Sequence, residues 1–600
     1  MMWVATRRRS LWRAAQAVGL GLGLAVLSAC GGGGGGDAVN PPPEPVPEVK
    51  PTRAEAARFL TQATFGPTTA HIDAVVAQGY AAWLDAQLAK PASLSYVSYW
   101  DARNAALGGT TANPKAGQRE VLDAFWTQAV SGDDQVRARV AYALSQIFVV
   151  SMLDSGVGNN SRGLASYADM LGAKGLGRYR DLLESVALHP VMGTYLTSLH
   201  NMKENTRTGR VPDENFAREV MQLFSIGLVQ LNADGSVKTS GGSPVPTYTP
   251  SDISGLAKVF TGWSYACPVS DDSCFFNGVS RDSERDIDAM IKPMRSYPQF
   301  HSSSVKSFLG ATVADQGSNA DPAASLKVAL DTLAGHPNVG PFLARQMIQR
   351  MVTSNPSPAY VGRVASAFAA GNGDMKALVR AVLLDTEARS SNGLTDPSFG
   401  KLREPVLRLS AFLRAFDAKS DSGSWLVGTT DSNTDGLSQT PFRAPSVFNF
   451  YRPGYVPSGG QLGLAGLLAP EMQITHESSV VGYVNYMSMA LQFGVGQNGY
   501  DYKATRRDVQ PDFLRDTTHA LRTLAATDAE VPALVDQVAT RLLPSPMPAA
   551  LKDIIAPAVL SIAVPVANGK NQDQIESAKL NRVRTAVMLT LASPEYTVQK

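Results

Sequence analysis

The chain has 600 residues, of which 44% are hydrophobic and 18% are charged, and its formal net charge is +2. This apolar content is enough to bury a large core, which excludes a chain that is disordered throughout. The near-neutral charge gives no electrostatic basis for binding nucleic acid, because proteins that do so concentrate basic side chains on one surface.

The first 29 residues predict an export signal. They carry arginines at positions 7, 8, 9 and 13, then a short apolar run, and they lead into Leu27-Ser28-Ala29-Cys30. The apolar run is too short to span a bilayer comfortably, as in secretory signals. The last four residues resemble a bacterial lipobox, which implies cleavage before Cys30, lipidation of its thiol and attachment to a membrane. The alternative is a plain secretory signal in which Cys30 is incidental.

Residues 30–52 predict a tether between that anchor and a folded body at residues 53–600. Gly31–Gly36 has the composition of a flexible linker, and Asn40–Pro51 has that of a stiffer, extended spacer. By resemblance to bacterial lipoproteins, Gly31 in place of Asp favours the outer membrane over retention at the inner one. We therefore expect an exported cell-envelope protein that faces the periplasm or the cell surface and has the membrane as a partner through Cys30.

The body is predicted to be mainly α, with a large multi-helix core. From Arg53 onward, apolar residues recur at three- and four-residue spacing in most segments, as in amphipathic helices. One β-hairpin is predicted over residues 228–239, with its turn at residues 233–235. Two stretches rich in Gly, Ser and Asp, near residues 265–300 and 418–462, predict long irregular loops.

The densest group of candidate functional side chains lies in residues 213–226. At 100° per residue this segment predicts an amphipathic helix whose polar arc includes Glu214, Arg218 and Glu219. Glu214 and Arg218 are four residues apart and can pair, whereas the two glutamates lie too far round the helix to form a close carboxylate dyad. Two interpretations stay open. The arc is a solvated face, or it lines a pocket in which Arg218 orients an acid or binds an anion.

Two histidines could complete such a site. His200 and Glu204 have the spacing of two ligands on one helix face, but their segment has the pattern of a helix end, and no metal site is predicted. His301 lies among hydroxyl residues near Lys306, which favours a structural hydrogen-bonding role over catalysis. The catalytic candidates are therefore Glu214, Arg218 and Glu219 with His200 or His301, and the cofactor is left open.

Cys267 and Cys274 are the only cysteines besides Cys30. In an oxidising compartment they favour a small loop-closing disulfide. A metal pair is the less favoured alternative, because no second Cys/His cluster lies nearby in the sequence.

An aromatic and arginine-rich segment, Thr440–Tyr455, lies within the second long loop region. Its prolines fix the backbone path, and its aromatic side chains can anchor it, so we expect an irregular segment packed onto the helical body. The alternative is a stacking surface for a sugar or another ring.

Several blocks together resemble the DUF1800 family of mostly secreted bacterial proteins. The blocks are AARFLTQATFGPT, YRDLLESVALHPVMGTYL, PDENFAREVMQLFSIGL, GLAKVFTGW, FHSSSVKSFLG, TPFRAPSVFNFYRPGY and ASPEY. The resemblance runs from about residue 53 to the C-terminus and carries no established activity. Related members often have His-Asp where this chain has His301-Ser302, which weakens a role for an acid beside that histidine.

Two classes of function follow from these features. The first is a hydrolase that acts on an extracellular or envelope polymer. The second is a non-catalytic surface-binding or scaffold protein whose partner is a glycan, a polymer or another protein.

Overall fold

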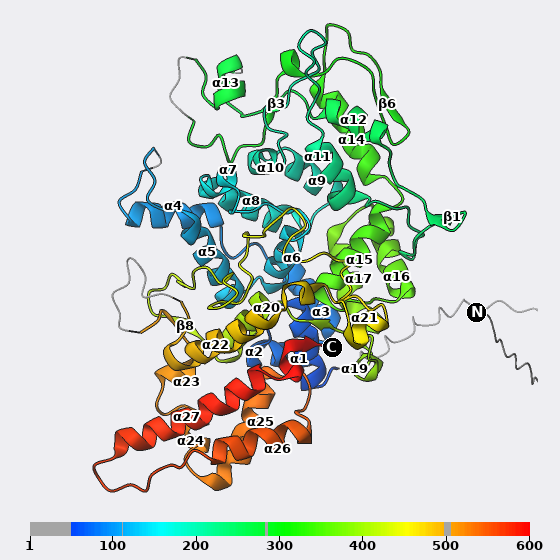
Figure 1. The fold of residues 1–600 in the computed structure, drawn as a ribbon. Coiled ribbons are helices and arrows are strands. Elements are labelled where there is room, and N and C mark those ends of the chain that lie inside the picture. The colour runs from blue at the N-terminus through cyan, green and yellow to red at the C-terminus, as the bar shows by residue number, and fades with distance from the viewer. Residues whose placement is uncertain (1–49, 111, 270, 282–285, 497–505) are drawn as a thin grey trace, which may run out of the picture. The chain divides into compact units, whose positions relative to one another are not determined.

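The computed structural model describes residues 50–110, 112–269, 271–281, 286–496 and 506–600 (Figure 1). Residues Val49–Lys600 form one compact unit. The predicted signal peptide, Cys30 and most of the predicted tether lie outside the described residues. In the described part of the chain, no helix has both the length and the apolar character needed to cross a membrane.

The mainly α prediction is confirmed, because the described residues contain 28 α-helices and only two-stranded sheets. The first group of helices begins where Thr52 caps α1 in a reciprocal pair with Glu55. These helices are α1 (Arg53–Ala63), α2 (Thr69–Gln78), α3 (Tyr80–Ala89), α4 (Tyr96–Ala106), α5 (Gln118–Ser131), α6 (Gln135–Ser145), α7 (Ser155–Gly158), α8 (Ser161–Lys174), α9 (Tyr179–Ala187) and α10 (Pro190–Tyr195).

The middle of the chain adds a second group of helices, and most of the long ones bury one apolar face. In α17, for example, Leu378, Val379 and Val382 are buried. The elements are α11 (Asn215–Glu219), the π-helix η1 (Val220–Ser225), α12 (Pro250–Val259), α13 (Asp272–Asn277), the 3₁₀-helix η2 (Pro298–Phe300), α14 (Pro322–Ala334), α15 (Val339–Met351), α16 (Pro358–Ala370), α17 (Met375–Leu384), α18 (Thr386–Arg389) and α19 (Asn392–Thr395).

The C-terminal elements return to the N-terminal ones. Gly66 lies so close to α20 that an added Cβ would be 2.5 Å from the Cα of Ala411, and its φ of +135° also favours glycine. The elements are α20 (Pro405–Ala415), α21 (Gly460–Leu464), η3 (Pro470–Ile474), α22 (Glu477–Phe493), α23 (Asp512–Arg515), α24 (Ala520–Leu524), η4 (Asp528–Glu530), α25 (Val531–Leu542), α26 (Ala549–Leu560), α27 (Gln572–Leu591) and α28 (Pro594–Thr597).

The strands form five two-stranded antiparallel sheets in the described part of the chain. One of them pairs the C-terminus with residues 401–402, and the Nε of Arg58 donates to the carbonyl of Lys600 at 2.9 Å. The two ends of the body are therefore joined. The pairs are β1 (Thr239–Ser240) with β2 (Ser243–Pro244), β3 (Trp263–Ser264) with β4 (Arg295–Ser296), β5 (Lys306–Phe308) with β6 (Ala311–Val313), β7 (Lys401–Leu402) with β10 (Val598–Gln599), and β8 (Lys419–Ser420) with β9 (Val509–Gln510).

The predicted hairpin is present. Leu231 pairs with Val237 across the turn, and Gly235 has a φ of 76°. The strand pair β1–β2 follows directly after this turn, at residues 239–244. The turn of this pair lies at residues 241–242, so a second hairpin follows the predicted one.

The two predicted loop regions are ordered in different ways. Pairing of β3 with β4 closes the base of the 265–300 region, which also contains α13. Residues 421–459 have no helix or strand, yet Trp425, Leu437 and Tyr451 are buried. Some rings of the aromatic segment 440–455 thus pack into the body, as expected for an irregular segment packed onto the helices.

Candidate functional site

The segment 213–226 is not one α-helix. The α-helical part ends at Glu219, and residues Val220–Ser225 form a π-helix. The hydroxyl of Ser225 donates to the carbonyl of Val220 five residues earlier at 2.5 Å, which stabilises the wider turn. The prediction of a constant 100° per residue is therefore wrong beyond Glu219. Ser225, which that spacing would place on the polar arc, is fully buried.

Glu214 and Arg218 lie on an open surface. The Nη2 of Arg218 is 3.4 Å from the Oε2 of Glu214, and the two side chains are 45% and 42% exposed. Glu219 is buried, and its Oε2 has no hydrogen-bond partner among the described residues. Burial raises the pKa of Glu219, and the charge of Arg218 opposes that rise. One turn of helix thus carries a solvated ion pair beside a buried acid.

His200 lies on a segment that packs against the start of this helix. The side-chain amide of Asn201 exchanges hydrogen bonds with the backbone of Asp213, at 2.9 and 3.1 Å. The imidazole of His200 packs instead against Tyr265 and Phe275, with ring centroids 5.2 and 5.8 Å away. Burial lowers the pKa of His200, and in the part of the chain that the structure describes its Nε2 has no hydrogen-bond partner.

His200 and Glu204 do not share a helix face, because residues 200–204 are not helical and His200 has a φ of 67°. Glu204 instead accepts hydrogen bonds from Ser302 at 2.9 Å and Ser304 at 2.6 Å. Burial opposes its ionisation, but these hydrogen bonds and the charge of Lys258 lower the pKa of Glu204 on balance. His200 and Glu204 therefore belong to different environments.

His301 is fully buried and held at both ring nitrogens. Its Nδ1 is 2.7 Å from the carbonyl oxygen of Thr261, and its Nε2 is 3.1 Å from the hydroxyl of Ser325. Burial lowers the pKa of His301 to about 4, although the hydrogen bond to Thr261 opposes that shift. A neutral imidazole in this setting acts as a hydrogen-bonding link between segments.

The sequence-predicted residues are thus not gathered into one site. Within the described residues, no hydrogen bond or ion pair joins His200 or His301 to Glu214, Arg218 or Glu219. The same residues contain no group of three or more His, Cys, Asp or Glu placed to hold a metal ion.

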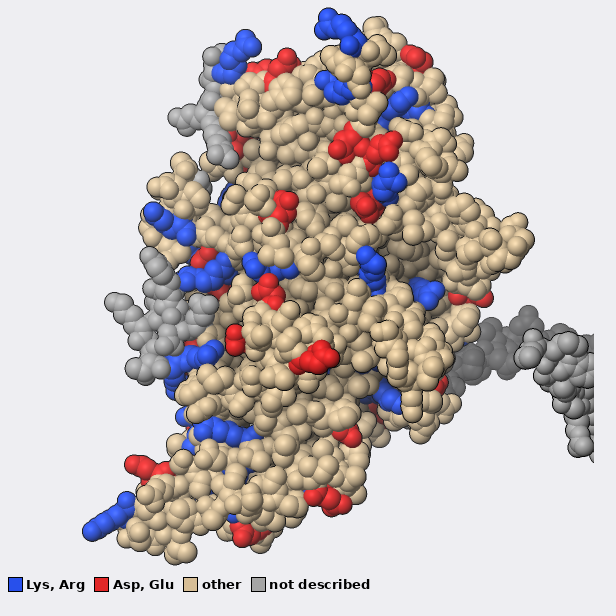
Figure 2. Space-filling view, in the orientation of Figure 1, with Lys and Arg blue, Asp and Glu red and all other residues tan. Residues whose placement is uncertain are grey.

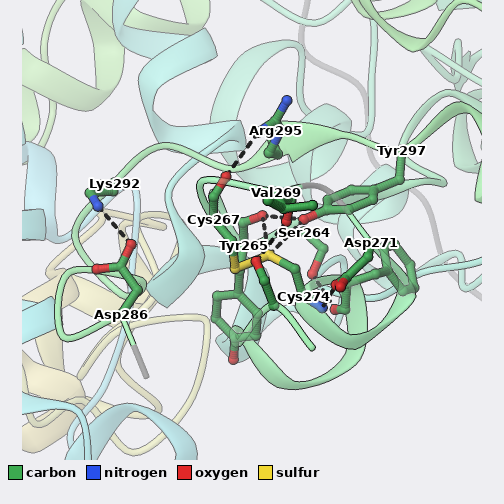
Figure 3. Close-up of a disulfide and its surroundings, with 12 residues drawn as sticks. Ser264, Tyr265, Cys267, Val269, Asp271, Cys274, Asp286, Lys292, Arg295 and Tyr297 are labelled. Atoms are coloured by element: carbon green, nitrogen blue, oxygen red, sulfur yellow. Dashed lines mark hydrogen bonds and ion pairs between the residues drawn. A yellow bond between two sulfur atoms is a disulfide. The ribbon is translucent and has the colours of Figure 1, made fainter. Parts of the chain in front are cut away.

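A disulfide joins Cys267 to Cys274 within the 265–300 region (Figure 3). The cysteines pack with Phe275 and Tyr297 in a small satellite core. The hydroxyl of Tyr297 donates to the carbonyl of Tyr265 at 2.6 Å. The disulfide therefore fixes a loop whose aromatic side chains also pack against His200.

A second set of charges is completely enclosed. The Nζ of Lys401 is 2.8 Å from the Oε1 of Glu471, and both side chains are at most 2% exposed. Glu404, also buried, accepts hydrogen bonds from Tyr142 at 2.8 Å and Gln439 at 3.0 Å. Burial raises the pKa of Glu471, and Lys401 opposes that rise. These groups tie together segments distant in sequence.

An open cleft of about 600 Å³ lies between the start of α9 and α14, α15 and α16. This volume is within the range of small-molecule binding sites. The backbone N–H of Tyr179 donates to the carbonyl of Gly373 at 2.8 Å, which positions the start of α9 at the cleft. Its wall includes Arg178, Arg180, Asp331 and His336.

The cleft carries an excess of positive charge. Arg180 pairs with Glu184 at 2.6 Å and with Asp331 at 2.7 Å, and Asp331 also pairs with Lys327 at 2.5 Å. Arg178 is exposed and forms no ion pair with any residue that the structure describes. Its guanidinium is thus available to an anionic ligand.

His336 forms the opposite part of the cleft wall. Its Nδ1 accepts a hydrogen bond from the backbone of Asn338 at 3.1 Å. Burial is the main cause of a lowered pKa of His336, and the charge of Lys238 lowers this pKa further. The ring is therefore neutral near pH 7. A neutral ring held in this way can offer its other nitrogen to a polar ligand.

The cleft is connected to the π-helical segment. The hydroxyl of Tyr179 donates to the carbonyl of Phe224 at 2.8 Å. The amide of Asn338 donates to the carbonyls of Ile226 at 2.9 Å and Val229 at 2.8 Å. The segment with the densest sequence signal therefore supports the cleft from behind instead of lining it.

A family model described as a protein of unknown function (DUF1800) matches residues 58–598. The chain belongs to the DUF1800 family. No curated protein and no solved structure matches it.

The cleft of this DUF1800 protein was not predicted from its sequence. Arg178 and Arg180 flank a tyrosine at the start of a helix, which is an ordinary position for charged side chains, and His336 has the pattern of a helix end. The pattern Arg-Tyr-Arg directly before an apolar helix was the available signal. This pattern forms a cleft only together with residues 331–341 and 365–373, which are distant in the sequence.

On the face shown in Figure 2, basic and acidic side chains are interspersed, and neither kind gathers into one large patch. This distribution agrees with the near-neutral net charge of +2. The positive character of the cleft is therefore a local feature of the DUF1800 body.

Proposed function

We propose that this DUF1800 protein is an exported, lipid-anchored protein of the cell envelope whose body binds an anionic glycan in the cleft at the start of α9. The unpaired guanidinium of Arg178 in a cleft of about 600 Å³ is the observation that carries this proposal. The lipobox-like ending at Cys30 supports the anchor.

The chemistry of the wall favours an anionic sugar. Arg178 supplies a planar, permanently charged donor that matches a carboxylate or a phosphate. Small apolar residues such as Ala334, Ala369 and Pro337 form other parts of the wall, against which the C–H face of a sugar ring can pack. Acidic glycans are also the anionic polymers that an exported envelope protein meets.

An array of carboxylated, phosphorylated and neutral glycans tests the binding proposal. We expect the acidic glycans to bind. Arg178→Ala should weaken their affinity at least about ten-fold, because it removes a charged hydrogen bond. Lys174→Ala is the matched control, because it removes an exposed cation at the end of α8, outside the cleft wall. Equal binding by both variants would refute the proposal.

A hydrolase that acts through Glu219 is the second candidate. The burial of this acid, whose Oε2 accepts no hydrogen bond from the described residues, favours it, and burial raises its pKa in the direction that suits a general acid. A polymer-hydrolysis screen compares the parent with Glu219→Gln. An activity that is lost with Glu219→Gln but retained with Arg178→Ala would favour this candidate over glycan binding alone.

Metabolic labelling tests the anchor separately. We expect palmitate incorporation and globomycin-sensitive processing in the parent, and neither in Cys30→Ala. Unchanged processing and labelling in that variant would remove the lipid anchor from the proposal.

A further inference from the structure

The outer face of α26 exposes large apolar side chains that no other part of the described chain covers. On its inner side, Ile555 and Val559 are fully buried, as expected for a helix that packs against α25 and α27. On its outer side, Ile554 is 63% exposed and Leu560 is 41% exposed, and Val566 in the following loop is 89% exposed. Large apolar side chains exposed together on a surface mark an interaction site.

Charged side chains are few here. Between residues 544 and 571 they are Lys552, Asp553 and Lys570. Lys552 pairs with Asp536 of α25 at 2.5 Å. Asp553 is exposed beside Ile554, so this face carries one carboxylate among its apolar side chains.

The entry of the N-terminal segment into the body points to the partner. Arg53, the first residue of α1, lies with Asp536 of α25 and Lys552 of α26 around a surface cleft of about 310 Å³. The sequence that leads to Arg53 from Cys30 is short, from Gly31 to Thr52. A lipid attached to Cys30 would therefore hold α26 within reach of the same membrane.

We propose that the outer face of α26 and the loop at residues 561–571 lie against a phospholipid surface and so orient the body on its membrane. In Figure 1 this loop joins α26 to α27 at the lower end of the ribbon, whereas the elements of the glycan cleft, α9 and α14–α16, lie higher. Shallow insertion of apolar side chains from a helix and a loop is a common mode of interfacial attachment. This inference rests on the proposed lipid anchor for its choice of partner.

Vesicle flotation of the mature Cys30→Ala chain tests this face without the anchor. We expect it to float with vesicles of phosphatidylethanolamine and phosphatidylglycerol, and Ile554→Asp with Val566→Asp to lower the floating fraction about five-fold or more. Val211→Asp is the matched control, because Val211 is 75% exposed and lies outside this face. Binding should change little between low and high salt, because its main source is apolar burial.

Three results would overturn the inference. The Cys30→Ala chain does not float, or the paired aspartate variant floats as well as Val211→Asp. Alternatively, light scattering finds a dimer that only the paired variant dissociates, which would assign the face to a second copy of the chain. The palmitate experiment on Cys30 is independent of all three, so a missing anchor and a missing membrane face are distinguishable.

Discussion

His301 is expected to make the body less stable in mild acid. Its pKa in the folded chain is about 4, because burial disfavours the charged ring. In the unfolded chain a histidine has a pKa of about 6.5. Between these values the unfolded chain binds a proton that the folded chain does not bind. The stabilisation from the neutral ring is therefore complete above the unfolded pKa and is lost as the pH falls toward the folded pKa.

The size of this effect follows from the two pKa values. Between pH 7.5 and pH 5.0, proton binding by the unfolded chain at this one residue lowers the free energy of unfolding by about 2 kcal/mol. His301→Asn removes the titrating ring, so the variant should lose about 2 kcal/mol less than the parent over this interval. The hydrogen bonds that the variant loses lower its stability at both pH values and leave the difference unchanged.

Urea unfolding followed by tryptophan fluorescence at the two pH values measures this difference. His71 and His189, which also have lowered pKa values, contribute equally to parent and variant and cancel. His476→Asn, at an exposed position, is the control and should behave as the parent. An identical loss of stability in the parent and His301→Asn would refute the reasoning.

Three further changes are predicted from contacts of contrasting burial. Lys401→Met leaves Glu471 as an uncompensated buried charge and should cost about 3–5 kcal/mol of unfolding free energy in urea titrations; a cost below about 1 kcal/mol would contradict this reading. Arg218→Met, the matched control at an exposed pair with Glu214, should cost less than about 1 kcal/mol, and a larger cost would show that the pair is more than a solvated contact. Cys267→Ser opens a short loop and should cost at most about 2–3 kcal/mol, seen as faster proteolysis within residues 265–300; unchanged proteolysis would argue against a role in fixing that loop.

Local sequence patterns predict the elements whose causes are local. Apolar spacing indicates the helices because each helix buries one face, and the turn residues before Ser236 indicate the hairpin because Gly235 takes a positive φ. The disulfide is a similar case, since Cys267 and Cys274 lie in one loop.

The candidate site depends on contacts that no local pattern reports. Glu219 and Arg218 are neighbours in sequence, yet one is buried and the other exposed, because packing decides which side of the helix meets α12. The π-helical turn depends on one hydroxyl, that of Ser225, bonding five residues back. His301 takes its partners from residues 261 and 325, which a reading of nearby residues does not bring together.

The cleft illustrates the same limit. Arg178 gains its significance because Arg180 and Lys327 pair with Glu184 and Asp331, and this pairing is a property of the folded arrangement of α9 and α14. The conspicuous segment before Gly227 has an indirect role in this arrangement. It holds the cleft wall in place through the hydrogen bond from Tyr179 to Phe224.

Calorimetric titration of the parent, Arg178→Ala and Lys174→Ala with an acidic oligosaccharide selected from the array tests the central claim most directly. We predict one binding site in the parent, affinity weakened at least about ten-fold by Arg178→Ala, and unchanged affinity with Lys174→Ala. Equal affinities in all three proteins would contradict the assignment of the cleft as the binding site.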